Sequence, residues 1–184
     1  MIEGEYSGPL DEGIRHGNGI LEWSNGDRYE GAFKKGLRGG FGVFYEQKTK
    51  RKYEGMWNLS RREGKGQETF GNGDVYIGEF SKDRFEGQGE LTTKGGKYKG
   101  SFKDGYKHGL GTMLFKNNSR YEGSWKLGRM HGKGLYVWPD TRKYEGEWLN
   151  GERYIFFLLS LSTLSLSLSL LLLLLLLLLL LLLS

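Results

Sequence analysis

The sequence has no cysteine and only two prolines among its 184 residues. Without cysteine the chain can form neither a disulfide nor a thiolate metal site, which fits a reducing compartment. The scarcity of proline, together with an aromatic content of 14%, excludes collagen and proline-rich disordered proteins. Glycine is abundant instead, with 31 residues interspersed among tyrosine, tryptophan and phenylalanine. This mixture indicates strands in which aromatic rings lie on bare backbone.

Charge and hydropathy also limit the function classes. The formal net charge is +5, which permits an anionic partner without requiring one. The first five residues are acidic and polar, and they lack the basic and apolar regions of a secretory signal.

A repeated motif organises most of the chain. Tyr-x-Gly recurs at spacings of 22 to 24 residues, with its tyrosine at Tyr6, Tyr29, Tyr53, Tyr76, Tyr98, Tyr121 and Tyr144. Four residues after each tyrosine stands a bulky apolar residue, namely Leu10, Phe33, Trp57, Phe80, Phe102, Trp125 and Trp148. A Gly-x-Gly pair follows in the first six repeats, starting at Gly17, Gly40, Gly64, Gly87, Gly109 and Gly132. A register kept this closely predicts one structural unit for each repeat.

Each repeat reads as a β-hairpin. In residues 29–33 the side chains alternate, so that Tyr29, Gly31 and Phe33 share one face of a strand. A turn follows, and a return strand begins at the Gly-x-Gly pair. Connections to the next repeat use Asn25-Gly26, Asn72-Gly73 and Gly95-Gly96, dipeptides that favour type I′ turns. A helix is unfavourable, because each interior glycine costs about 1 kcal/mol relative to alanine.

We therefore predict an all-β fold: an elongated, twisted, single-layer antiparallel sheet of tandem hairpins with about 13 or 14 strands. Rings of one strand should lie over the glycines of its neighbour, so that one face buries apolar area without a second layer. The second repeat carries an extra residue near residues 47–52, which predicts a longer loop or a bulge. The predicted boundaries are an N-terminal lead at 1–5, repeats at 6–28, 29–52, 53–75, 76–97, 98–120 and 121–143, a partial repeat at 144–153, and a tail at 154–184.

Stretches such as Tyr144-Glu145-Gly146-Glu147-Trp148 resemble the MORN (membrane occupation and recognition nexus) repeat. The resemblance covers residues 6 to about 153 and implies an elongated antiparallel sheet. It also implies a non-enzymatic scaffold or adaptor that joins proteins to each other, or membrane to cytoskeleton. Two alternatives stay open: a module that binds phosphoinositides or anionic membranes, and a truncated regulatory region of an enzyme such as a phosphatidylinositol-phosphate kinase. The resemblance implies a cytoplasmic location with membrane, cytoskeletal or ciliary association.

The aromatic stripe supplies the candidate protein contacts, although its recurrence in every repeat favours a packing role. These candidates are Tyr29, Trp57, Tyr76, Tyr98, Trp125 and Trp148. Proteins are the expected partners, and the ends of an open sheet could also pair two copies of the chain.

Basic residues collect near the predicted turns and in the irregular loop of the second repeat. The candidates for anionic lipid are Lys34, Lys35, Arg38, Lys48, Lys50, Arg51, Lys52, Arg61, Arg62, Lys126 and Arg129. If successive turns align, the basic residues beside them form one edge, and each charge near an anionic leaflet contributes about 1 kcal/mol. An ordinary solvated surface is the alternative interpretation.

Signatures of catalysis, cofactors and nucleic acid are missing from the sequence. It has no cysteine nucleophile and no P-loop, and its acidic residues repeat with the array. We therefore predict no enzymatic activity, no cofactor and no nucleic-acid partner. His16, His108 and His131 occupy equivalent turn positions in different repeats, which favours solvated side chains over a metal site.

The seventh repeat breaks off before its Gly-x-Gly pair, and a Leu/Ser segment ending in an unbroken run of leucine follows. Two interpretations compete. The segment exceeds the ~20 apolar residues that span a bilayer, so it could be a transmembrane tail. Alternating Leu and Ser is also what a CT dinucleotide repeat encodes, which favours a gene-model artefact with further native sequence lost.

Overall fold

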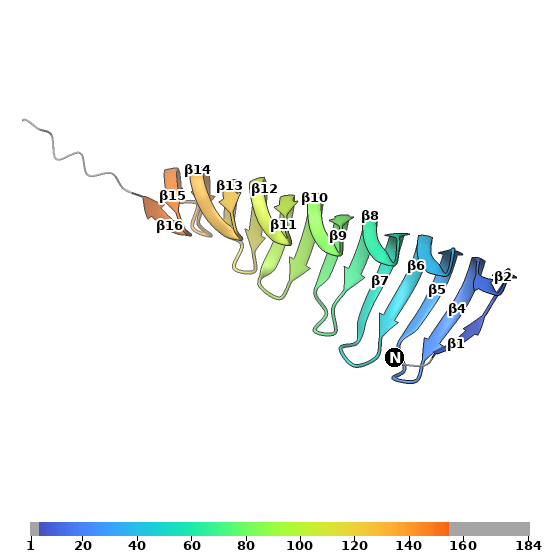
Figure 1. The fold of residues 1–184 in the computed structure, drawn as a ribbon. Helices are drawn as coiled ribbons and strands as arrows, with labels where there is room; N and C mark the ends of the chain where they lie inside the picture. Colours follow the sequence, from blue (N-terminus) through green and yellow to red (C-terminus); the bar gives the residue numbers. More distant parts are fainter. Residues whose placement is uncertain (1–3, 155–184) are drawn as a thin grey trace, which may run out of the picture. The chain divides into compact units, whose positions relative to one another are not determined.

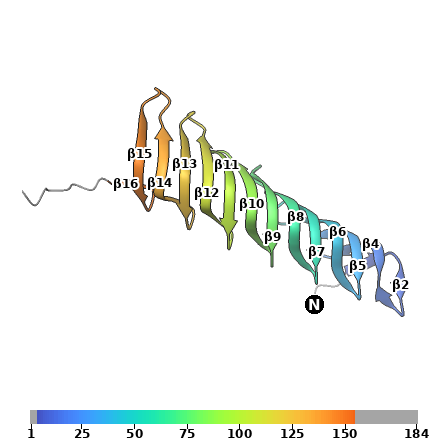
Figure 2. The ribbon, with the colours of Figure 1, turned by 90° about the horizontal axis from the view of Figure 1, so that it is seen from above.

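The structure, a computed structural model, describes residues 4–154. These residues form one open antiparallel sheet of fourteen strands that follow one another in chain order, together with a separate two-stranded ribbon. Figure 1 shows the strands side by side from β1 to β16, and Figure 2 shows the same row from above. The predicted all-β, single-layer fold of tandem hairpins is confirmed.

The fourteen strands of the sheet are β1 (Gly4–Ser7), β4 (Gly17–Trp23), β5 (Arg28–Lys34), β6 (Leu37–Glu46), β7 (Arg51–Asn58), β8 (Arg61–Thr69), β9 (Val75–Ser81), β10 (Arg84–Thr93), β11 (Gly96–Lys103), β12 (Tyr106–Phe115), β13 (Arg120–Lys126), β14 (Arg129–Val137), β15 (Lys143–Leu149) and β16 (Glu152–Tyr154). The short ribbon pairs β2 (Leu10–Asp11) with β3 (Ile14–Arg15). The first strand of each repeat carries the tyrosine of the Tyr-x-Gly motif, and the return strands of the first six repeats carry the Gly-x-Gly pair.

The turn inside each repeat joins its two strands through two residues. Its two central residues both have positive φ, as in Lys35-Gly36, Leu59-Ser60 and Leu127-Gly128. This is the type I′ geometry, whose twist matches that of the flanking strands. The backbone N–H of the second central residue also donates to the preceding repeat, for example from Gly36 to the Arg15 carbonyl oxygen at 2.9 Å. Each turn is therefore hydrogen-bonded to the start of the preceding repeat's return strand, along one edge of the sheet.

The prediction of type I′ turns between repeats is wrong. Neither Asn25 nor Asn72 has positive φ; only the following Gly26 and Gly73 do. The Gly26 N–H donates to the Trp23 carbonyl oxygen at 2.8 Å, so a four-residue turn ends in a left-handed glycine. In the fourth repeat the two-residue loop is residues 94–95, because Thr93 pairs with Gly96.

The extra residue of the second repeat lengthens a loop and does not create a bulge. Strands β6 and β7 pair without interruption from Gly40 opposite Trp57 to Glu46 opposite Arg51. The loop between them covers residues 47–50. It packs against the neighbouring loops, because the Gln47 N–H donates to Asp27 Oδ1 at 2.9 Å.

Bulges occur instead where the Gly-x-Gly pair begins. Between β5 and β6, Ala32 alone lies opposite residues 39–41, so the return strand carries two extra residues. Gly40 within this bulge has φ of 89°, a conformation that side-chain-bearing residues rarely adopt. The second glycine of the pair serves a different purpose: a Cβ atom at Gly42 would lie 2.5 Å from Cζ of Tyr29. The predicted contact of rings with a neighbouring strand's glycines is therefore confirmed.

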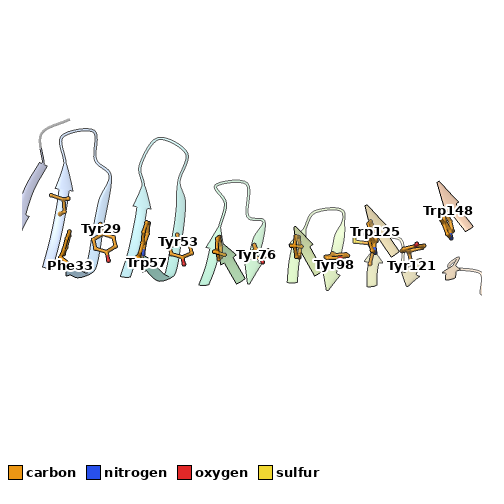
Figure 3. Packing of buried hydrophobic residues seen from close by; sticks show 13 residues of the cluster. Tyr29, Phe33, Tyr53, Trp57, Tyr76, Tyr98, Tyr121, Trp125 and Trp148 are labelled. Atoms are coloured by element: carbon orange, nitrogen blue, oxygen red, sulfur yellow. The ribbon is translucent and has the colours of Figure 1, made fainter. Parts of the chain in front are cut away.

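The core is a single row of interlocking rings on one side of the sheet (Figure 3). We name this side, which carries Tyr29, Tyr53, Tyr76, Tyr98 and Tyr121, the ring face; these tyrosines are 0–2% exposed. Each one meets the apolar ring of its own repeat and that of the next repeat edge to face. Tyr53, for example, lies 5.1 Å from Trp57 and 4.9 Å from Phe80. Edge-to-face pairs contribute about 0.5–1.5 kcal/mol beyond area burial, so neighbouring repeats stabilise each other.

Hydrogen bonds hold these rings in place. The Tyr29 hydroxyl donates to the Ala32 carbonyl oxygen at 2.9 Å, and Tyr98 donates to the Ser101 carbonyl oxygen at the same distance. The Trp57 indole donates to the Gly42 carbonyl oxygen at 3.1 Å. Each polar atom of a buried ring thus has a backbone partner.

Chain contacts divide the chain into a unit of residues 1–153 and a unit of residues 154–184. Both interpretations of the Leu/Ser tail concern residues 154–184, of which 155–184 lie outside the described residues, while Tyr154 ends β16. Among residues 4–154, no helix meets the length and hydropathy that a membrane span requires.

Candidate binding surfaces

Long side chains cover part of the ring face. They come from the position nine residues after each repeat tyrosine. Arg38 lies over Trp57, with Cζ 4.2 Å from the ring centroid. Arg62 lies over Phe80 at 5.2 Å, and Lys107 places Nζ 5.0 Å from Trp125. In the fourth repeat Phe85 takes this position and stacks on Tyr76 at 3.7 Å. Cation–π and ring stacking therefore shield a face that no second layer covers.

Burial of these groups shifts their proton affinities. Loss of solvation lowers the pKa of Arg38 and the pKa of Lys107. The same cause raises the pKa of Tyr29 and the pKa of Tyr121 from 10.0 to about 12. Arg38 and Lys107 are therefore partly desolvated cations that lie over tyrosines whose hydroxyl groups stay neutral.

Glu68 is the one charged residue buried in the ring layer of the described chain, at 2% exposure. The equivalent positions of the neighbouring repeats hold Phe44 and Leu91. Its carboxylate forms ion pairs with Arg51 and, at 2.9 Å, with Arg62. Arg62 in turn contacts Asp83 Oδ1 at 3.4 Å. Two guanidinium groups thus neutralise the carboxylate, as burial of a charge requires.

This ion cluster borders a hollow of about 260 Å³ on the ring face, lined also by Arg38, Phe44 and Trp57. Its charged lining is balanced, because the arginines Arg38, Arg51 and Arg62 face the carboxylates Glu46, Glu68 and Asp83. The hollow therefore has no excess charge that would select an ionic ligand.

The six aromatic residues proposed as partner contacts all belong to the buried ring row. Tyr29, Tyr76 and Tyr98 are 0% exposed, and Trp57, Trp125 and Trp148 are 5% exposed. Their burial gives them a packing role in the sheet, and a role in binding a partner stays a prediction.

The eleven basic candidates lie in three places. Lys34, Lys35, Arg61, Lys126 and Arg129 are exposed beside the stacked turns, and the structure brings these five onto one edge. Arg38 and Arg62 lie over rings on the ring face. Lys48, Lys50, Arg51 and Lys52 belong to the opposite edge, where Arg51 pairs with Glu68 and Lys52 with Glu54.

We name the edge of stacked type I′ turns the turn edge; it comprises residues 11–14, 34–37, 58–61, 81–84, 103–106, 126–129 and 149–152. Besides its basic groups it exposes large apolar side chains, which the sequence-based interpretation missed. Leu59 is 69% exposed and Leu127 is 64% exposed. Both have positive φ, 47° and 49°, at a turn position that glycine, asparagine or aspartate would fit with less strain. Folding therefore gives no reason for leucine at either tip.

The opposite edge has a different composition. Its loops, at residues 24–27, 47–50, 70–74, 94–95, 116–119 and 138–142, contain no exposed large apolar residue, because Phe70 and Trp138 are half-buried. They are held by local hydrogen bonds, such as that from the Asp27 N–H to Asn25 Oδ1 at 3.1 Å. Exposed apolar side chains next to lysine and arginine therefore distinguish the turn edge.

The face opposite the rings, which we name the open face, also carries exposed apolar side chains. Phe41 is 56% exposed and Ile77 is 51% exposed. Two hollows of about 650 and 500 Å³ lie on this face, and Phe41 lines both. Sequence reasoning missed this surface as well, although the variation at these positions from repeat to repeat was a visible signal.

The three histidines do not converge. His16 is exposed, and His131 has a buried Nδ1 without a hydrogen-bond partner among residues 4–154. Within the same residues, no group of three or more His, Cys, Asp or Glu side chains is arranged to hold a metal ion.

Comparison with known proteins matches the repeats to one family. The model of the MORN repeat matches residues 3–28, 29–45, 53–75, 76–97, 98–120, 121–141 and 144–153, together more than half of the chain. Alsin from Homo sapiens, from Pan troglodytes and from Mus musculus is 28% identical over 117 residues in each case. The matched region is 61% of this chain and 6% of alsin, so the chain spans only a small part of these relatives.

Two solved structures show distant similarity. One is the Drosophila melanogaster SAS-4 TCP domain in complex with a proline-rich motif of Ana2, with 15% identity and a TM-score of 0.45 over 72% of this chain and 73% of that one. The other is the TCP10c domain of Drosophila melanogaster Sas-4, with 12% identity and a TM-score of 0.38 over 72% of this chain and 93% of that one.

Proposed function

This chain belongs to the MORN repeat family, and from that premise we propose that it is a scaffold whose turn edge docks on anionic membrane surfaces. The observation that carries the proposal is the coincidence, on one edge, of exposed leucines and exposed basic groups. Neither feature stabilises the sheet, and both suit a lipid surface.

The charge of the turn edge favours an anionic leaflet. Its seven turns hold eight basic residues, Lys34, Lys35, Arg61, Lys82, Arg84, Lys103, Lys126 and Arg129, against five acidic residues, Asp11, Glu12, Asp83, Asp104 and Glu152. The basic excess lies in the turns of the second to sixth repeats. Arg84 and Asp104 pair at 2.7 Å. Each basic group near an anionic surface contributes about 1 kcal/mol, and stacking of the turns lets several approach together.

The apolar tips supply the second component of binding. A leucine side chain moved fully from water into an apolar phase contributes about 1.5–3 kcal/mol. Leu59 and Leu127 project from turns that also hold Arg61, Lys126 and Arg129. Stable membrane attachment generally needs two such signals together.

The test uses residues 1–153, which form one compact unit and exclude the Leu/Ser segment. We expect this fragment to sediment with vesicles that contain phosphatidylserine and not with neutral phosphatidylcholine vesicles, and binding should fall at high salt. The double variant Leu59→Asn/Leu127→Asn should weaken binding about tenfold or more. Leu110→Asn, at an equally exposed open-face residue (71%), is the matched control and should bind like the parent chain. Equal sedimentation with neutral vesicles, or no effect of the double variant, would contradict the proposal.

A further inference from the structure

The open face holds a second surface whose chemistry differs from that of the turn edge. Its two hollows meet at Phe41, and their apolar lining consists of Ile20, Ala32, Phe41, Val43 and Ile77. We name this surface the Phe41 groove. The backbone of paired glycines, such as Gly66 opposite Gly78, forms part of its floor.

Packing within the sheet does not explain these apolar side chains. Phe41 and Ile77 lie on the face away from the ring row and stay more than half exposed. At the position of Phe41 the third repeat has Lys65 and the fourth has Gln88, so the sheet forms without an aromatic there. Apolar side chains gathered in a hollow of this size mark a contact site.

The charged lining of the groove is acidic. Glu30, Glu54 and Glu79 line it, against Lys65 alone. Glu30 pairs with Arg28 at 2.8 Å and Glu54 with Lys52 at 3.0 Å, through side chains about half exposed. Exposed pairs of this kind are weak, so an incoming cation can compete for either carboxylate.

Glu79 is the carboxylate most available to a ligand. It receives a long hydrogen bond of 3.4 Å from the Gln88 N–H and has no ion pair among the described residues. The lining of the groove thus holds more acidic than basic residues, the reverse of the turn edge.

We infer that the Phe41 groove binds a partner-protein segment that carries apolar side chains flanked by lysine or arginine. The lining runs from Ser7 on β1 to Gln88 on β10, across eight adjacent strands. At ~4.8 Å per strand this is roughly 34 Å, room for about 10 residues of extended chain or about 22 residues of helix. This surface is separate from the turn edge, so the scaffold can hold a basic amphipathic partner while its edge contacts lipid.

The experiment measures binding of two labelled peptides to the full chain by fluorescence anisotropy. One peptide is an amphipathic sequence of leucine and lysine, and its counterpart has glutamate in place of lysine. We expect the Leu/Lys peptide to bind at least tenfold more tightly than the Leu/Glu peptide. Phe41→Asp should weaken Leu/Lys binding roughly tenfold or more, since the aromatic side chain that the peptide would cover is lost. Leu110→Asp, on the same face but outside both hollows, should leave it unchanged.

Hydrogen exchange on the full chain locates the bound peptide. Protection is expected in β5 to β9 and not in β13 or β14. Phe41→Thr, which keeps a strand-forming residue at this position, provides a second variant and should also lose binding.

Three results would overturn the inference: equal binding of both peptides, equal effects of Phe41→Asp and Leu110→Asp, or concentration-dependent dimers that Phe41→Asp abolishes. The last result would mean that a second copy of the chain occupies the groove. Phe41→Asp in residues 1–153 should still sediment with anionic vesicles, so failure of this inference is distinguishable from failure of the membrane proposal.

Discussion

The two faces of the sheet differ in how much their residues vary from one repeat to the next. On the ring face, each of the first six repeats has a tyrosine above two glycines. On the open face, one repeat position holds Phe41, Lys65, Gln88, Leu110 and Lys133 in turn. The ring face must repeat because each ring packs against both neighbouring repeats. The open face is free to vary, so it and the edges are where individual repeats acquire binding chemistry.

Alkaline titration tests the whole ring face at once and should have the largest effect. Burial raises the pKa of Tyr29 and Tyr121 to about 12, and it also raises the pKa of Tyr53, Tyr76 and Tyr98. The fold favours the neutral phenol, so this stabilisation is complete below pH 10 and is lost as the pH rises through about 12. We expect cooperative unfolding in that window, followed by circular dichroism, with tyrosinate absorbance rising in the same transition. Ionisation of all the tyrosines near pH 10 with the sheet intact would show that the rings are not buried.

Substitution of two adjacent residues, one on each face, gives the most direct comparison of how the faces contribute to stability. Tyr76→Ala removes a ring that contacts Phe80, Phe85 and Phe102, and we expect it to lower the free energy of unfolding by about 3–5 kcal/mol. Ile77→Ala, one residue later on the open face, should cost less than about 1 kcal/mol because its side chain is already half exposed. Urea denaturation of both variants provides the comparison, and similar losses would show that the faces do not differ in this way.

Glycine substitution examines the contact between ring and backbone. A Cβ atom at Gly66 would lie 2.6 Å from the Tyr53 ring, so Gly66→Ala should destabilise the sheet by about 1–3 kcal/mol. At Gly39 the nearest atom would be 3.7 Å away, in ordinary contact, and φ is not positive. Gly39→Ala should therefore be neutral or stabilise by up to about 1 kcal/mol. Thermal melts of the two variants decide between this account and a general intolerance of alanine in the return strands.

The smallest expected effect on stability comes from the turn edge. Leu59→Asn places a residue that tolerates the left-handed region at φ of 47°, so we expect the free energy of unfolding to rise by about 0.5 kcal/mol or stay unchanged. The same substitution should weaken vesicle binding. A clear loss of stability would mean that Leu59 packs in the folded protein, and it would remove the reason to assign this side chain to a lipid surface.

Much of the fold was predictable from residue spacing. Seven Tyr-x-Gly motifs and six Gly-x-Gly pairs predicted the hairpins, their order and the contact of rings with glycines. The turn types were not predictable in the same way, because Asn-Gly fits both a type I′ turn and a turn that ends in a left-handed glycine. Loop length and strand pairing decided between them: the tight turns occur at tips such as Lys35-Gly36, where hydrogen bonds to the preceding repeat stabilise positive φ.

The candidate sites were less accessible to sequence reasoning. Basic residues near turns were visible, yet Arg38 and Arg62 were grouped with Lys34 and Arg61 although they cover rings on the ring face. Alternation assigns a residue to a face, but the ring that it covers depends on how the next repeat stacks. Glu68 stands where the neighbouring repeats have Phe44 and Leu91, and its burial between two arginines depends on Arg51, seventeen residues away in the chain.

By itself, the sequence determined the repeat, the antiparallel sheet and the placement of rings over glycine, because these follow from local alternation and from a motif that recurs seven times at nearly constant spacing. Only the tertiary structure decided which cations lie over the rings, which leucines stay exposed at the turn edge, and where the open face is hollowed beside Phe41. Those features depend on side chains from different repeats meeting across strands, and the relative positions of such side chains are set by stacking rather than by spacing along the chain.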